Sequence, residues 1–204
     1  MVRLNEYIIQ KLRLYKVISE DEVEIYKFGI ECFILKLIHC ISYIGIALCL
    51  GMLPELLVIG GVLIPLRRSA GGFHAKTKAG CYIFSCFYVL LLLLISKAAI
   101  IQWAWWGALV LSDGIIFFMS PADNDNKKLD ILEIQHYRKK SRYILLAVNI
   151  GCIVLFMFSF NKIGQLLCCG ICAAAFLLIL HKATTLTQTS HLFKALDALK
   201  NSNS

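Results

Sequence analysis

Charged side chains are scarce in this sequence. They make up 17% of the 204 residues, whereas 59% are apolar. A typical soluble domain carries about 25% charged and about 45–50% apolar residues. The stretch from Tyr82 to Ile95 contains neither a charge nor a proline. These shortages exclude an ordinary soluble domain and indicate one integral membrane domain that covers residues 1–204.

The N-terminal arm, residues 1–27, lacks the uninterrupted apolar core of a secretory signal, so we expect no cleavable signal peptide. Instead, Leu4, Ile8, Leu12 and Tyr15 recur at helical spacing among basic side chains. This pattern predicts an amphipathic helix, for which two locations fit. The helix lies either in the interface of an anionic membrane or against the cytoplasmic face of the protein itself.

Six apolar segments follow the arm and predict an all-α, polytopic bundle of about six transmembrane helices. They cover residues 28–50, 52–66, 80–100, 103–120, 143–160 and 163–181. Lysine and arginine concentrate in the arm, in the loops 67–80 and 121–142, and in the tail 182–204. If every segment crosses, these regions share one side, and the positive-inside rule places both termini in the cytoplasm. Segment 52–66 is the weakest span, since it would rise only about 22 Å, and a re-entrant hairpin is the alternative.

The formal net charge of +8 has a simple explanation in the same pattern. Basic residues flank the apolar segments, where they orient the spans and meet anionic lipid. We therefore expect membrane lipid as a partner and no nucleic acid.

Nine cysteines suggest a disulfide framework, but their positions argue against one. Eight lie inside apolar segments, where cysteine behaves as a small apolar residue. The ninth, Cys81, borders a polar loop that is predicted to be cytosolic, and disulfides are rare in the cytosol.

One polar stretch carries residue types suited to catalysis. Residues 67–81 read RRSAGGFHAKTKAGC, with His74 and Cys81 seven residues apart. A cysteine nucleophile acts as its thiolate, so it needs a nearby base and a positive environment. His74 can accept the thiol proton, and Cys81 would lie in the first turns of a helix if Thr77 caps it. Arg67 adds a fixed cation.

Gly71 and Gly72 permit backbone conformations closed to other residues, so the chain can fold back and bring His74 to the helix start. A free backbone N–H in such a turn could serve as an oxyanion hole. The plainer alternative is a basic interfacial loop with an incidental histidine and a small apolar cysteine. A metal site is disfavoured, because one His–Cys pair lacks the third and fourth ligands that zinc takes, and no cofactor is expected.

The pattern R-R-S-A-G-G-F-H-A-x5-C resembles the accessory gene regulator B (AgrB) family of Gram-positive bacteria. The second loop, Pro121–Leu129, is similar to that family's N-K-P-L stretch with an upstream proline, although Lys128 stands at the position of the family's second proline. Together with the six apolar segments, these motifs extend the resemblance over essentially the whole chain.

The resemblance implies a membrane-embedded cysteine endopeptidase of the bacterial cell membrane. Family members cut the C-terminal tail from a small propeptide, of the AgrD type, and promote its closure to a thiolactone or lactone quorum-sensing signal. Carried over by motif, Cys81 is the nucleophile and His74 the general base, with Arg67, Gly71 and Gly72 in supporting roles. The oligomeric state stays open, with a homodimer among the arrangements considered.

Basic residues in and after the second loop are assigned to the substrate. Lys127, Lys128, Lys139 and Lys140 would attract an acidic propeptide tail, although a solvated patch that faces lipid is the commoner explanation of such charge.

Other chemically capable residues fit packing better. Cys86 would lie about 7.5 Å deeper than Cys81 and roughly 140° around the helix. Asp113 could orient His74, but its expected depth favours a hydrogen bond between helices. Glu31, Lys36 and His39 lie in the first segment. Charges at such depth are often functional, yet Lys36 could pair locally and Glu31 is near the interface.

Two other functions compete with the peptidase. A small exporter or permease for a peptide, without proteolytic activity, would predict inverted repeats or broken helices at the midplane, and we find neither. A non-catalytic membrane scaffold would leave the clustered arginines, glycines, His74 and Cys81 unexplained.

Overall fold

The computed structural model describes residues 2–73, 75, 77–98, 101–122 and 130–202. Within these ranges the chain is helical and contains no strand, which confirms the predicted class of helical membrane protein. The elements in chain order are α1 (Val2–Leu14), the short 3-10 helix η1 (Glu20–Glu22), α2 (Val23–Leu50), α3 (Leu53–Ala70), α4 (Lys78–Lys97), α5 (Gln102–Met119), α6 (Ile131–Met157) and α7 (Asn161–Ser202).

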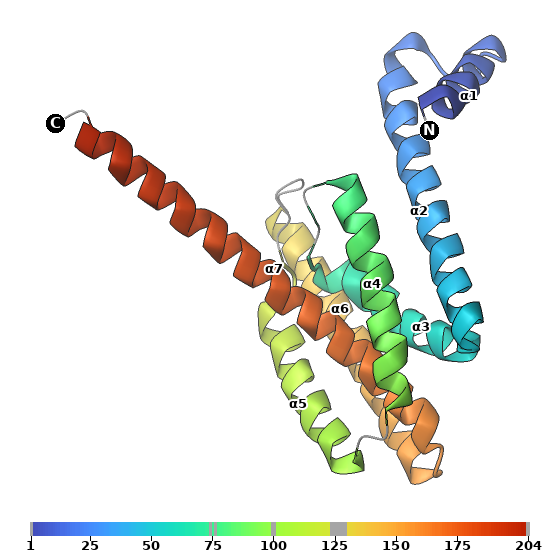
Figure 1. Ribbon diagram of the computed structural model, residues 1–204, viewed down its shortest axis with the longest axis vertical. Coiled ribbons are helices and arrows are strands. Elements are labelled where there is room, and N and C mark those ends of the chain that lie inside the picture. The colour runs from blue at the N-terminus through green and yellow to red at the C-terminus, as the bar shows by residue number, and fades with distance from the viewer. Residues whose placement is uncertain (1, 74, 76, 99–100, 123–129, 203–204) are drawn as a thin grey trace.

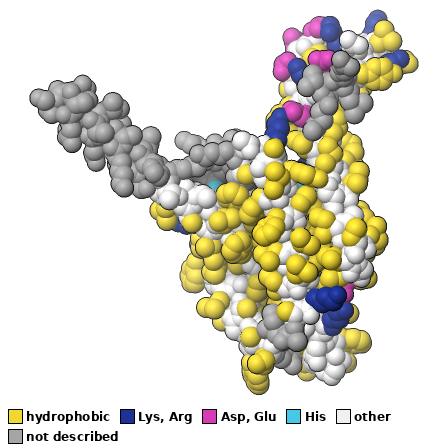
Figure 2. All heavy atoms as spheres, in the orientation of Figure 1, with side chains coloured by type: hydrophobic (Ala, Val, Ile, Leu, Met, Phe, Trp, Pro, Cys, Tyr) yellow, Lys and Arg dark blue, Asp and Glu magenta, His cyan; other side chains and the backbone are white. Residues whose placement is uncertain are grey.

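Among the described residues, four helical segments are long and apolar enough to cross a bilayer. They are Glu20–Leu50, Lys78–Lys97, Ile131–Met157 and Asn161–Thr187. α3 and α5 have 18 residues each. Each is therefore about 27 Å long, close to the roughly 30 Å of a hydrocarbon core. Apolar side chains cover the flanks of the helices, while charged ones gather at the end that carries α1 and in a smaller cluster near the opposite end (Figure 2).

α7 is the central helix of the bundle and packs against α3, α5 and α6 (Figure 1). Small residues allow helix backbones to approach closely in a membrane, and α7 buries a run of them: Cys168, Cys169, Gly170, Ala173, Ala174 and Ala175. Gly170 shows how near α3 comes. A Cβ built on Gly170 would lie 2.8 Å from the Val62 Cβ and 3.2 Å from the Ile59 carbonyl oxygen. Glycine is therefore the residue that fits this crossing.

α2 packs far less tightly than α7. Only 6% of the most apolar window of α2 is buried, against 61% for α7. α2 meets α3 and α4 through a small cluster near its C-terminal end: Ala47, Met52, Val89 and Leu93. The rest of its length stands beside α4 with an apolar surface that a bilayer can cover.

α1 folds back onto the start of α2. Ile9 is buried there, and Asn5 Nδ2 donates to the Lys27 carbonyl at 3.1 Å. Of the two predicted locations, packing on the protein itself therefore holds for the face with Asn5 and Ile9. Tyr7 and Tyr15 remain exposed, so they are free to meet a membrane interface.

Contacts between connections define two ends of the bundle. Lys162 pairs with Glu55 at 2.9 Å, which places the starts of α7 and α3 at one end. At the other end, Lys78 pairs with Glu31, so the first turns of α4 lie beside the upper part of α2. This arrangement agrees with the alternation predicted from the basic residues.

The first basic loop is shorter than predicted. Arg67 and Arg68 belong to the last turn of α3, and Lys78 already begins α4. The connection therefore shrinks from 67–80 to 71–77, because α3 continues beyond its apolar segment for one more turn.

The second loop was also predicted too long, since Lys139 and Lys140 lie in α6, which begins twelve positions before the expected residue 143. Asp130 caps the helix: its carboxylate accepts the Ile131 N–H at 2.7 Å, and Glu133 accepts the Asp130 N–H at 3.3 Å. Hydropathy marks the part of a helix that lies in hydrocarbon, whereas the cap marks where the helix starts. α7 likewise extends beyond its apolar segment and continues through the predicted tail to Ser202.

Candidate active site

Cys81 lies in the first turn of α4, half-buried. The predicted cap is confirmed, because Thr77 Oγ1 accepts the Gly80 N–H at 3.1 Å and the Thr77 carbonyl accepts the Cys81 N–H at 2.9 Å. Thr77 is extended and so ends the preceding connection cleanly. The thiol therefore sits at the positive end of the helix dipole.

The connection that leads to α4 is held to the bundle at three points. Arg67 Nη2 donates to the Phe73 carbonyl at 2.8 Å across the turn. The Phe73 N–H donates to the Leu177 carbonyl of α7 at 3.0 Å. The Ala122 N–H, after α5, donates to the Ala70 carbonyl at 2.8 Å. Two helices, α3 and α7, and the chain after α5 thereby hold the backbone of this loop.

The two glycines have the conformations that the sequence predicted. Gly71 has φ +82° and Gly72 has φ +150°, both in the region that side chains disfavour. Space is short as well, since a Cβ on Gly71 would lie 2.7 Å from the Ala122 carbonyl oxygen, and one on Gly72 would lie 3.3 Å from the Leu177 Cβ. The glycines therefore let the loop pass between α7 and the chain after α5.

Three predicted site residues, His74, Lys127 and Lys128, lie outside the described residues. Lys139 and Lys140 are described and are exposed on α6.

The chain neighbours of position 74 both lie against the first turns of α4. The Phe73 ring packs edge-on against Phe84, with centroids 5.0 Å apart. Ala75 lies beside Gly80, since a Cβ built on Gly80 would be 3.7 Å from the Ala75 Cβ. Gly80 directly precedes Cys81, and Phe84 follows it by one turn. The loop therefore faces the turn of α4 that carries the thiol.

Sequence reasoning missed a polar group beside the thiol. Ser85 Oγ of α4 donates to the Cys81 carbonyl at 2.6 Å. The spacing of four between Cys81 and Ser85 was a usable signal, because residues four apart share one helix face.

A polar contact joins α2 to the start of α4. The hydroxyl groups of Ser42 and Tyr82 lie 2.7 Å apart. The His39 ring packs edge-on against Tyr82 and Tyr43, with centroid distances of 5.3 and 5.8 Å. His39 of α2 therefore packs against the residue that follows Cys81 in α4.

Two of the other residues weighed on the sequence form polar contacts with neighbouring helices. Asn149 Nδ2 of α6 donates to Asp113 Oδ1 at 3.1 Å, which confirms the expected hydrogen bond between helices. Glu31 pairs with Lys78. All nine cysteines are free thiols, and Cys86 is half-buried. In the part of the chain that the structure describes, no group of three or more His, Cys, Asp or Glu residues is placed to hold a metal ion.

Fold and site together define a helical membrane protein with a free thiol at the capped start of a spanning helix, faced by a glycine-rich loop. The family model of accessory gene regulator B (AgrB) matches residues 3–179. The chain therefore belongs to the AgrB family, which supports its involvement in accessory gene regulator quorum-sensing peptide processing. Searches of curated proteins and of solved structures found no match to the chain.

Proposed function

We propose that this protein is a membrane-embedded cysteine endopeptidase that removes the C-terminal tail of a small quorum-sensing propeptide and promotes closure of the remainder to a thiolactone or lactone. The observation that carries the proposal is the placement of Cys81. Its thiol lies at a capped helix start, and both neighbours of position 74 pack on the same turns. The proposal assigns His74, the residue between these two neighbours, as the base for this thiol.

In the proposed reaction, His74 takes the proton of Cys81, and the thiolate attacks the carbonyl carbon of the scissile peptide bond. The C–N bond then breaks, the leaving amine of the tail takes the proton back from His74, and an acyl thioester remains on Cys81. A thiol of the propeptide attacks this thioester and displaces Cys81. One thioester replaces another, so the step succeeds only if water is kept away from the acyl group.

The supporting residues have positioning roles in this scheme. Arg67 holds the Phe73 carbonyl and so fixes the residue before His74. The N–H groups of Gly71 and Phe73 are bonded to Arg67 and Leu177 carbonyls. Among the described residues 71–73, we therefore propose the Gly72 N–H as the oxyanion donor. The basic side chains of α6, Lys139 and Lys140, would attract an acidic tail.

We place the site at the cytoplasmic face of the bacterial cell membrane, with both termini inside. The excess of basic residues in the arm, the two long connections and the tail supports this orientation. Reporter fusions or accessibility labelling at position 76 test it. An extracellular signal there would reverse the proposed orientation.

The decisive test is cleavage of a propeptide by the purified, reconstituted protein. Cys81→Ser should abolish cleavage, a loss on the order of 10³-fold or more, because serine is much harder to deprotonate. His74→Ala should slow it about 10²–10⁴-fold through loss of the base. Cys86→Ser, one turn away, is the matched control and should keep most activity. If Cys81→Ser cuts at the normal rate, the peptidase mechanism is wrong and a peptide exporter becomes the better proposal.

A further inference from the structure

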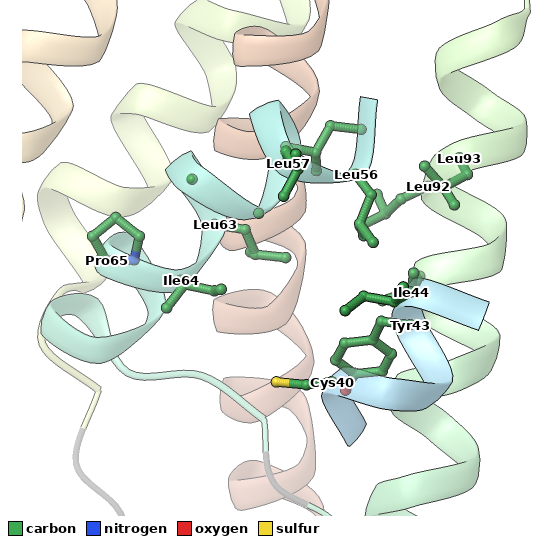
Figure 3. A pocket seen from close by; sticks show the side chains of 14 residues that line it. Cys40, Tyr43, Ile44, Leu56, Leu57, Leu63, Ile64, Pro65, Leu92 and Leu93 are labelled. Carbon is green, nitrogen blue, oxygen red and sulfur yellow. The ribbon is translucent and has the colours of Figure 1, made fainter. Parts of the chain in front are cut away.

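A cavity of about 500 Å³ lies between α2, α3 and α4. Figure 3 shows side chains of all three helices turned toward one space, among them Ile44 of α2, Leu56, Leu63 and Ile64 of α3, and Leu92 of α4. Its lining is apolar apart from Tyr43 and Cys40. Ile64 is 60% exposed, so the cavity is a groove that opens toward the hydrocarbon of the membrane.

A glycine pair in α3, Gly60 and Gly61, keeps the groove hollow. Helix glycines in membranes usually admit a neighbouring helix, as Gly170 does. A Cβ on Gly61 would meet nothing within 4 Å, and one on Gly60 would meet only Ile64 of its own helix. An interior glycine destabilises a helix relative to alanine. The glycine pair therefore admits no neighbouring helix and leaves an open space in the groove.

The groove lies next to the candidate active site. Tyr43 lines it and packs edge-on against His39, whose ring also packs against Tyr82, the residue that follows Cys81. Val89, its first lining residue on α4, follows Cys81 by two helical turns, about 12 Å along the axis. An extended peptide advances about 3.3–3.6 Å per residue. A peptide held at Cys81 therefore reaches the groove three or four residues from the bond under attack.

We propose that this groove is a subsite for a bulky apolar side chain of the substrate peptide, three or four positions from the scissile bond. The inference rests on the proposed peptidase function and adds the chemistry of its substrate. The groove lies within a few peptide residues of the Cys81 turn, and this nearness favours a peptide over an unrelated lipid chain. The loose packing of α2, buried over only 6% of its most apolar window, gives such a peptide lateral access.

The kinetic test fills the groove without touching the site. Gly61→Leu places a side chain in the hollow, and Gly45→Leu makes the same change in α2 at a position that is open and outside the groove. With a propeptide that carries leucine or phenylalanine at the subsite position, Gly61→Leu should lower kcat/KM about tenfold or more. With alanine there, Gly61→Leu and wild type should agree. Equal kcat/KM for every propeptide with both variants would overturn the subsite while leaving the peptidase proposal intact.

A second measurement identifies the occupant without needing turnover. In a Cys81→Ser protein in lipid vesicles, a benzoylphenylalanine at Ile64, which lines the groove, should crosslink to added propeptide. The same group at Ile41, which is exposed on α2 outside the lining, should not. Crosslinks at Ile64 to lipid alone, or to a second copy of the chain, would overturn the subsite. A wild-type protein that cleaves no propeptide would instead refute the proposed function.

Discussion

The bundle around α7 differs in packing from the helical arm, by which we mean α1 and α2 together. In the bundle, glycine, alanine and cysteine bring helix backbones close together, and 61% of the apolar window of α7 is buried. In the arm, the corresponding fraction for α2 is 6%, and large apolar side chains point outward. Close packing supplies rigidity, whereas a helix with few buried contacts can shift at low cost.

The candidate active site lies on the seam between these regions. The bundle holds the loop before α4 through Arg67 and Leu177, and the arm supplies Tyr43 and His39 beside the start of α4. A rigid half can orient the reacting groups while the looser half admits a peptide from the membrane. Variants placed in the bundle and in α1 or α2 test this difference between the two regions.

The largest expected effect comes from one substitution made in both regions. Gly170→Leu would force α3 and α7 apart and should lower the free energy of unfolding by about 1–3 kcal/mol or more, since overpacking strains a close-packed core. Gly45→Leu adds the same side chain to open space on α2 and should change stability little. Thermal unfolding of the purified proteins in detergent measures both. Equal destabilisation of the two variants would erase the distinction between bundle and arm.

An intermediate effect should follow from detaching the loop from the bundle. Arg67→Ala removes the donor to the Phe73 carbonyl, a charged hydrogen bond of about 1.5–3 kcal/mol, and should slow cleavage roughly 10- to 100-fold. The neighbouring Arg68→Ala is the control, because Arg68 is exposed. Propeptide cleavage rates, with membrane insertion checked in parallel, give the comparison. Identical losses at both positions would point to a general charge effect.

The smallest expected effect is electrostatic. Lys139→Glu with Lys140→Glu should weaken processing of a propeptide with an acidic tail by a few-fold, and more at low salt, because exposed charges are screened by ions. Lys97→Glu, at the opposite end of α4, should leave processing unchanged. Cleavage rates measured over a range of ionic strength test this. Rates insensitive to both charge reversal and salt would limit Lys139 and Lys140 to a role in membrane orientation.

Local features of the site were predictable from the sequence. Thr77 three residues before Gly80 indicated a helix cap, and Gly71 and Gly72 indicated a turn with unusual backbone angles; the structure has both. Each follows from the chemistry of one or two residues and needs no knowledge of the rest of the chain. The apolar segments likewise predicted the helical membrane class.

Other features depend on which helices become neighbours, and the sequence alone does not encode that choice locally. Ser42 and Tyr82 are 40 residues apart, yet their hydroxyl groups meet. The start of α6 differs from the prediction for another reason. The prediction followed hydropathy, whereas the helix begins at the Asp130 cap. A capping signal outside an apolar run deserves equal weight when helix ends are predicted.

The hydrogen bond from the Phe73 N–H to the Leu177 carbonyl couples the position of the loop to the rotation of α7 about its own axis. Each residue of a helix turns the backbone by about 100°. Deleting one alanine between Gly170 and Leu177 would hardly change composition or hydropathy, but it would swing that carbonyl away from Phe73 or rotate Gly170 out of its crossing with α3. Natural variation in this stretch of α7 should therefore favour substitutions over insertions and deletions, because the angular register of one helix sets the geometry of a loop about a hundred residues earlier in the chain.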